Sequence, residues 1–295
     1  MAEPQKIREP FRLKKELRLA PGYILCIIWV VFTILIVAWT ICASLVSPSE
    51  IFSGSMMDAF FKRLANFELR FDNYVKAWTS AKLSNYFVNS LIYSAISLTS
   101  IILVAAPASY VLSRFKFRAN ALIQNMTSIA MGIPTVMIIM PLFSIATSLN
   151  MTGTRTTLVL LYIGINVPFT IFYLLAFFKN LPSGLEEAAA IDGCGAMHTF
   201  WRIMFPLAQP GIITVTVFNF IVIWNEFFMS MIFANDAKIR PIAVGLFNML
   251  QGMKYSGDWG GMFASAVIVF APTFVLYLFL SNKIIATVTG GAFKG

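Results

Sequence analysis

Six long apolar stretches restrict this 295-residue chain more than any other feature of its sequence. A helix that crosses a bilayer needs about 20 predominantly apolar residues. Because lipid offers no partners to backbone N–H and C=O groups, only helices and closed barrels can cross it. We therefore predict an all-α membrane protein with six transmembrane helices, at residues 22–46, 86–113, 121–148, 155–178, 209–233 and 261–285.

The composition agrees with a lipid environment and excludes several functions. The chain is 58% hydrophobic and 12% charged, whereas soluble domains carry about 25% charged residues. Its net charge is +9, but the basic residues lie between apolar runs, which favours membrane orientation over nucleic-acid binding. Three scattered cysteines predict neither a disulfide framework nor a metal site. The sequence has no phosphate-binding P-loop and no nucleophile–base pair, so we predict no catalytic residues and no enzymatic activity.

The orientation is predicted from Lys and Arg in the short links, because cytoplasmic loops carry the excess of these residues. The link between the second and third stretches holds Arg114, Lys116 and Arg118, whereas the next link holds Arg155 alone. This bias predicts that both termini are cytoplasmic, with tails at residues 1–21 and 286–295. The loop 47–85 is then external.

The cytoplasmic segment 179–208, between the fourth and fifth stretches, has a helical pattern of its own. Ser183 and Glu186 fit a capping box, in which each side chain satisfies a backbone N–H of the other. We predict a short helix over Leu185–Ile191, ended by Asp192 and by Gly193, which tolerates a left-handed backbone. A second short helix is predicted over His198–Phe205.

The first of these helices carries three consecutive small side chains, Ala188, Ala189 and Ala190. Small side chains let another protein surface approach the backbone closely, as in a helix inserted into a partner's cleft. An ordinary interfacial helix is the alternative, although such helices usually have bulky apolar and basic faces.

A longer motif runs through this segment with fixed spacing. Its residues are Glu187, Ala188, Ala189, Gly193, Ile203, Phe205 and Pro206. The motif resembles the EAA loop of inner-membrane components of binding-protein-dependent ABC importers. The one departure is Phe205, where leucine is usual. Further segments resemble the carbohydrate-uptake branch, and specifically the smaller six-span subunit of maltose-type and glycerol-phosphate-type permeases: residues 87–94, 113–119, 223–233 and 289–295.

This resemblance implies a type I ABC importer permease fold, with the permease domain at residues 86–285, in a bacterial-type cytoplasmic membrane. It implies a homologous second permease, two ATPase subunits that bind ATP and Mg, and an external solute-binding protein as partners. No cofactor is expected in this chain itself. The residues implied in coupling to the ATPase are Glu186, Glu187, Ala188, Ala189, Asp192, Gly193, Ile203, Phe205 and Pro206. An ion-gradient-driven secondary transporter, or a permease for a non-sugar solute, remains an alternative function.

The fifth stretch contains candidate residues for a translocation path. Asn219, Glu226 and Ser230 fall on one face if the stretch is a continuous helix at about 100° per residue. An acid inside a membrane is costly when it faces lipid, so Glu226 should face the bundle interior or a watery path. Asn225 is a weaker candidate because it points elsewhere. A role in packing or interhelical hydrogen bonding is the alternative for Glu226.

Overall fold

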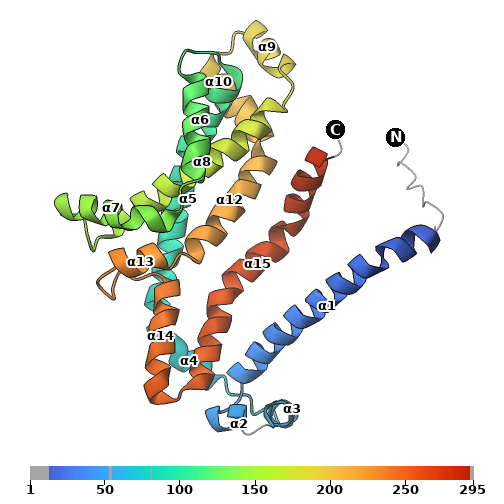
Figure 1. Cartoon of the computed structure of the whole chain (residues 1–295), viewed down its shortest axis with the longest axis vertical. Helices are drawn as coiled ribbons and strands as arrows, with labels where there is room; N and C mark the ends of the chain where they lie inside the picture. The colour runs from blue at the N-terminus through green and yellow to red at the C-terminus, as the bar shows by residue number, and fades with distance from the viewer. Residues whose placement is uncertain (1–12, 53–54, 81, 293–295) are drawn as a thin grey trace.

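The computed structural model describes residues 13–52, 55–80 and 82–292, and every regular element in these ranges is helical (Figure 1). Residues 1–12 and 293–295 of the two predicted tails lie outside the described residues. The helices are α1 (Leu13–Ser44), α2 (Pro48–Phe52), α3 (Met56–Ala65), α4 (Asp72–Thr79), α5 (Leu83–Arg114), α6 (Asn120–Met131), α7 (Thr135–Ser148), α8 (Arg155–Lys179), α9 (Gly184–Ile191), α10 (Ala196–Thr199), a π-helical turn (Phe200–Met204), α11 (Phe205–Leu207), α12 (Gln209–Trp224), α13 (Phe228–Phe233), α14 (Ile242–Ser256) and α15 (Trp259–Ala292).

Four helices in the described part of the chain are long and apolar enough to cross a membrane. They are Leu19–Ser44 of α1, all of α5, all of α8 and Trp259–Ser281 of α15. Two bent pairs meet the same criteria together, and counting each as one span gives up to six. One is α6 with α7, bent by 103°, and the other is Ala196–Leu207 with α12, bent by 72°.

Two of the predicted spans are therefore wrong as continuous helices. The stretch 121–148 is broken between Met131 and Thr135, where Pro134 has an extended backbone. Proline lacks an N–H and disfavours a helical residue before it, which accounts for the break. The stretch 209–233 ends as a helix at Trp224 and resumes at Phe228. Asn219 and Ser230 therefore do not lie on one continuous helix.

The bundle core forms where α5 and α8 pack along each other, with α12 against both (Figure 1). Tyr93 of α5, Leu158 and Tyr162 of α8, and Phe233 of α13 are almost fully buried in one cluster. These large apolar side chains supply the burial that holds the spans together once they are in lipid. The bundle thus positions α12 and the break after it against α8.

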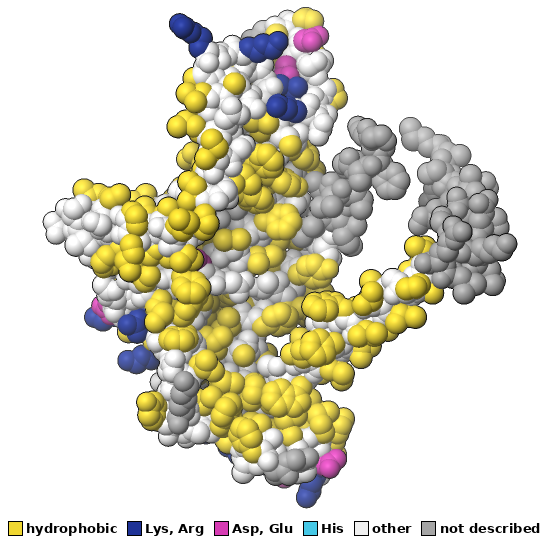
Figure 2. All heavy atoms as spheres, viewed as in Figure 1, with side chains coloured by type: hydrophobic (Ala, Val, Ile, Leu, Met, Phe, Trp, Pro, Cys, Tyr) yellow, Lys and Arg dark blue, Asp and Glu magenta, His cyan; other side chains and the backbone are white. Residues whose placement is uncertain are grey.

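The first helix stands apart from this bundle and contacts α15 and α3 (Figure 1). Most of its apolar side chains between Leu19 and Ile41 are exposed, including Trp29 at 70% and Leu35 at 62%. Figure 2 shows the hydrophobic side chains along its described part. Such a surface is stable only in an apolar solvent, so the side chains of α1 face lipid or another membrane helix.

The two ends of the bundle differ. Helices α9 and α10 lie at one end, and α2, α3, α4 and α14 lie at the other (Figure 1). The start of α1 and the end of α15 point toward the α9 end. The loop 47–85, for which the sequence analysis predicted no helices, thus contains three, and α14 follows the fifth span without having been predicted.

Candidate functional site

The cap that ends α9 is the best-defined feature of the segment 179–208. Gly193 has φ = +76°, as the sequence predicted. The N–H of Cys194 donates to the carbonyl of Ala189 at 2.9 Å, and that of Gly193 donates to Ala190 at 3.1 Å. This pair of bonds is a Schellman motif, which satisfies carbonyls that the helix end would otherwise leave free. The chain therefore turns sharply and reproducibly after Asp192.

The start of α9 differs from the prediction. Ser183 occupies the N-cap position, but its side chain makes no capping hydrogen bond, so the predicted capping box is wrong. Glu186 instead turns toward α5, where its Oε1 lies 3.2 Å from Nε of Arg114 in an ion pair without hydrogen-bond geometry. A second nitrogen of Arg114 donates to the carbonyl of Leu181 at 2.7 Å. Arg114 therefore ties the start of α9 to the end of α5, and Glu186 faces its own chain.

The outward face of α9 is only partly the one expected. Glu187, Ala188 and Asp192 are exposed, but Ala189 is buried at 3% and cannot fill a partner's groove. Two bulky apolar residues that were not predicted to be functional are also exposed here, Ile191 at 87% and Met197 at 71%. Their signal was available: both are large apolar residues flanking a polar turn in a cytoplasmic segment.

The remaining motif residues pack the segment 179–208 against the spans and do not form an exposed surface for a partner. Phe200 and Met204 are buried in a cluster with Leu174 and Phe178 of α8. The motif residues pack around this cluster: Ile203 and Phe205 are half-buried against it, and Pro206 is exposed at its edge. The cluster also contains residues of α5 and α12, so it joins the segment 179–208 to three spans.

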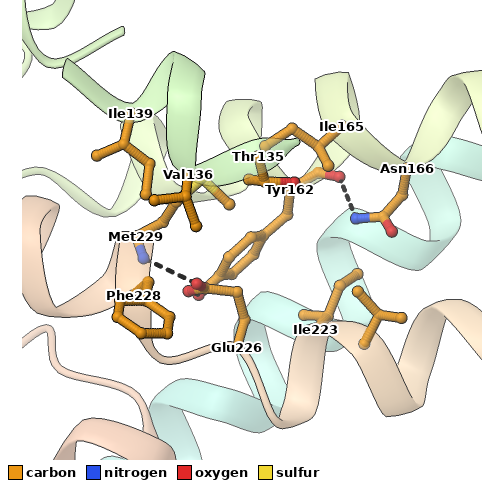
Figure 3. Close-up of a pocket in the computed structure, with 11 residues that line it drawn as sticks. Thr135, Val136, Ile139, Tyr162, Ile165, Asn166, Ile223, Glu226, Phe228 and Met229 are labelled. Carbon is orange, nitrogen blue, oxygen red and sulfur yellow. Dashed lines mark hydrogen bonds between the residues drawn. The ribbon is translucent and has the colours of Figure 1, made fainter. Parts of the chain in front are cut away.

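A small cavity of about 160 Å³ lies near the break after α12 (Figure 3). It is bounded by α7, α8, α12 and α13. Most of its lining is apolar, and its polar side chains are those of Thr135, Tyr162, Asn166 and Glu226. Figure 3 shows the Glu226 carboxylate beside the Tyr162 ring, both from segments that meet at the cavity.

Glu226 caps the first turn of α13. Its two carboxylate oxygens accept backbone N–H bonds from Met229 at 2.8 Å and Ser230 at 3.0 Å. The Ser230 hydroxyl adds a bond of 2.6 Å and also lies 2.6 Å from the hydroxyl of Tyr162. A carboxylate at a helix N-terminus satisfies unpaired N–H groups and interacts favourably with the helix dipole. Glu226 therefore stabilises the break while half-exposed beside the cavity.

The other predicted path residues lie in different places. Asn219 is buried and donates to the hydroxyl of Thr170 at 2.8 Å, and Ser230 is fully buried. Asn225 is exposed, bonds to the carbonyl of Ile221 and lines a second hollow on the other side of the break. The facing residues of α8 were not predicted, although they share one face at intervals of four: Tyr162, Asn166 and Thr170. That spacing was the signal that could have found them.

The chain is similar in sequence to known membrane transport components. Residues 99–283 match the family model of the binding-protein-dependent transport system inner membrane component. The chain is 33% identical over 277 residues to the diacetylchitobiose uptake system permease protein NgcG of Streptomyces coelicolor, covering 93% of this chain and 89% of the relative. It is 28% identical to the trehalose transport system permease protein SugB of Mycobacterium tuberculosis, covering 90% and 93%.

A solved structure shows the same fold. This is a chain of a bacterial ABC transporter involved in the import of the acidic polysaccharide alginate, with a TM-score of 0.77 at 18% identity. The match covers 93% of this chain and 99% of that one. Together with the matched family model, this likeness identifies a type I permease fold. The chain is a transport component and not an enzyme. The chain belongs to the family of inner membrane components of binding-protein-dependent transport systems.

Proposed function

We propose that this chain is one of two permease subunits of an ATP-driven importer, and that it moves a carbohydrate across a bacterial-type cytoplasmic membrane. The observation that carries the proposal is family membership over most of the chain. Relatives named for the uptake of diacetylchitobiose and trehalose support a sugar or sugar derivative as the solute. An external solute-binding protein delivers that solute, and two ATPase subunits bind ATP and Mg.

In this proposal α9 is the contact with an ATPase subunit. Its exposed Glu187 offers a carboxylate to a basic group, and the exposed Ile191 and Met197 offer apolar anchors. ATP can drive transport only if two states of the ATPase favour two states of the permease. The ion pair from Glu186 to Arg114 and the buried Phe200 cluster give α9 two attachments to the spans through which that bias can pass.

The cavity beside Glu226 is proposed as part of the translocation path. Its tyrosine, asparagine, threonine and carboxylate groups can exchange hydrogen bonds with the hydroxyls of a sugar. Asn219 and Ser230 support the path from within the protein, where they hold α8 to α12 and α13. Asn225 faces the opposite side of the break and is a peripheral residue in this proposal.

The sequence of the long spans disfavours a secondary transporter, which usually carries acids inside its membrane helices. The four stretches Leu19–Ser44, Leu83–Arg114, Arg155–Lys179 and Trp259–Ser281 contain no Asp or Glu. Glu226, in the break after α12, is a single acid, and it accepts two backbone hydrogen bonds from the first turn of α13. These four spans therefore offer no set of acids that could couple an ion gradient.

The solute class is tested by purifying the intact transporter with its binding protein and identifying the ligand that the binding protein retains. We expect mass spectrometry of the denatured binding protein to release an oligosaccharide or a sugar derivative. An amino acid, a peptide or an inorganic ion would overturn the carbohydrate assignment and leave the ATP-driven mechanism standing.

The orientation makes a separate prediction in intact cells. In a background lacking Cys26, Cys42 and Cys194, cysteines placed at positions 152 and 250 should react with an impermeant maleimide from outside. Cysteines at 117 and 195 should react only after the membrane is opened. Position 117 follows the end of α5, where Arg114 pairs with Glu186 of α9, and position 195 directly precedes α10. Labelling at 195 in intact cells would contradict both the orientation and the ATPase contact.

A further inference from the structure

Helix α3 lies crosswise to the helices that cross the membrane. Figure 1 shows α3 nearly end-on beside the last turn of α1, whereas α1, α5 and α15 run along the plane of the picture. Its ten residues carry an exposed apolar stripe, formed by Met57, Phe61 and Leu64 at 45%, 57% and 45% exposure. At about 100° per residue these three side chains fall within roughly 60° of one face.

The stripe continues a face that is already buried against α1. Met56 and the half-buried Phe60 pack against Cys42, Ala43 and Val46 at the end of α1. On the helical wheel Phe60 lies directly beside Leu64, so the apolar surface passes from the α1 contact to the stripe without a polar interruption. The α1 contact and the exposed stripe therefore form one apolar side of α3.

The charged side of α3 is held in the opposite direction. Asp58 and Lys62 are exposed at the polar edge, and Arg63 pairs with Glu50 of α2 at 3.0 Å. The Arg63 guanidinium, which hydrogen-bonds to the carboxylate, lowers the pKa of Glu50 to about 2, so this pair is charged at physiological pH. Figure 2 shows hydrophobic side chains over α2 and α3, with charged ones at the margin farthest from α1. The pair thus fixes the rotation of α3 about its own axis.

Phe67, just after α3, independently indicates that this part of the chain makes a contact outside the chain. The N–H of Glu68 donates to Arg63 at 2.8 Å and that of Phe67 to Leu64 at 3.3 Å, which is a Schellman cap. The left-handed position of this cap strongly favours glycine, yet here a phenylalanine adopts φ = +55°. The Phe67 side chain is 95% exposed, so it contributes almost nothing to packing within the chain. A bulky aromatic in a disfavoured backbone conformation indicates a contact outside the chain.

We propose that α3 and Phe67 form an interfacial anchor that lies in the headgroup region of the lipid bilayer. The stripe of Met57, Phe61 and Leu64 faces the acyl chains, Phe67 inserts beside it, and Lys62 faces the phosphates. Helices with one apolar face and a charged edge bind at this boundary. The anchor fixes the depth at which α1 leaves the membrane. The anchor requires only that α1 crosses the bilayer. Its place in the outer leaflet rests on the orientation given under the proposed function.

The test uses spin labels on the assembled transporter in nanodiscs of phosphatidylethanolamine and phosphatidylglycerol. Single cysteines replace Phe61, Leu64 or Phe67 in a chain whose native cysteines are removed, and Asp58→Cys and Lys62→Cys serve as controls on the same helix. Accessibility is measured to oxygen, which concentrates in lipid, and to a water-soluble nickel chelate. We expect a several-fold higher oxygen-to-nickel ratio at 61, 64 and 67 than at 58 and 62.

Two results would overturn the anchor. Equal, water-like ratios at all five positions would show that the stripe is in solvent. Low access to both reagents at 61, 64 and 67 would show that a protein partner covers them, and the binding protein would be that partner if its removal restored access. Neither result bears on sugar import, because uptake is not part of the measurement.

Discussion

Replacing Gly193 by valine should reduce transport by roughly tenfold or more while the permease still reaches the membrane. A β-branched residue at φ = +76° costs on the order of 1–3 kcal/mol, and 1.4 kcal/mol corresponds to a factor of ten. An ideal Cβ on Gly193 would meet no atom within 4 Å, so the effect acts through the backbone turn and not through a clash. The altered turn would misplace Ile191 and Met197 relative to the ATPase. Transport and binding-protein-stimulated ATPase activity are measured per reconstituted complex.

Two variants in the same segment control for this effect. Gly193→Asn should keep most of the transport, because asparagine tolerates the left-handed conformation better than other side chains. Gly195→Val should also be mild, since Gly195 has an extended backbone at φ = −70° and open space around its Cα. Near-normal transport by Gly193→Val would show that α9 is only a surface helix.

Glu226→Gln should lower substrate-dependent transport by roughly tenfold with complex yield within about twofold. The amide offers one acceptor where the carboxylate offers two, so one of the N–H groups of Met229 and Ser230 loses its partner. The first turn of α13 then loosens beside the cavity, and the hydrogen-bonding wall that faces the solute changes. Yield is measured by purification of the assembled transporter, and transport is normalised to it.

Asn225→Ala is the matched control, because Asn225 lies in the same break and bonds only to the carbonyl of Ile221 among the described residues. It should transport at close to the normal rate. If Glu226→Gln lowers the yield but leaves transport per complex unchanged, Glu226 has only a structural role. A cysteine at 226 that never reacts with small polar reagents, in any nucleotide state, would also contradict the path.

The length of the apolar stretches correctly predicted the long continuous helices. The long runs in α1, α5, α8 and α15 are recognisable because about 20 apolar residues leave few alternatives. Prolines inside these runs did not break every helix: Pro107 and Pro168 lie within the continuous helices α5 and α8. Pro134 lies at a 103° bend. The sequence shows where a backbone hydrogen bond is lost, but tertiary packing decides whether the helix bends there.

The errors at the candidate sites arose from contacts that the spacing of the residues did not indicate. Glu186 left the predicted capping box because Arg114, distant in the sequence, offers an opposite charge. The break at residues 225–227 contains neither proline nor glycine, so no local signal announced it. It exists because Glu226 can satisfy the N–H groups of a new helix from one residue before its N-cap. The pairing of Glu186 with Arg114 depends on the fold, whereas the Glu226 cap is a local contact that no proline or glycine marks.

The most direct test of ATP-driven import uses the purified transporter in liposomes with its binding protein and the labelled carbohydrate. We predict uptake only when ATP is supplied on the side of α9, and uptake that persists after ionophores have collapsed the proton and sodium gradients. Uptake by this chain alone, without ATPase subunits, or uptake that ionophores abolish while ATP remains, would contradict the function proposed for it.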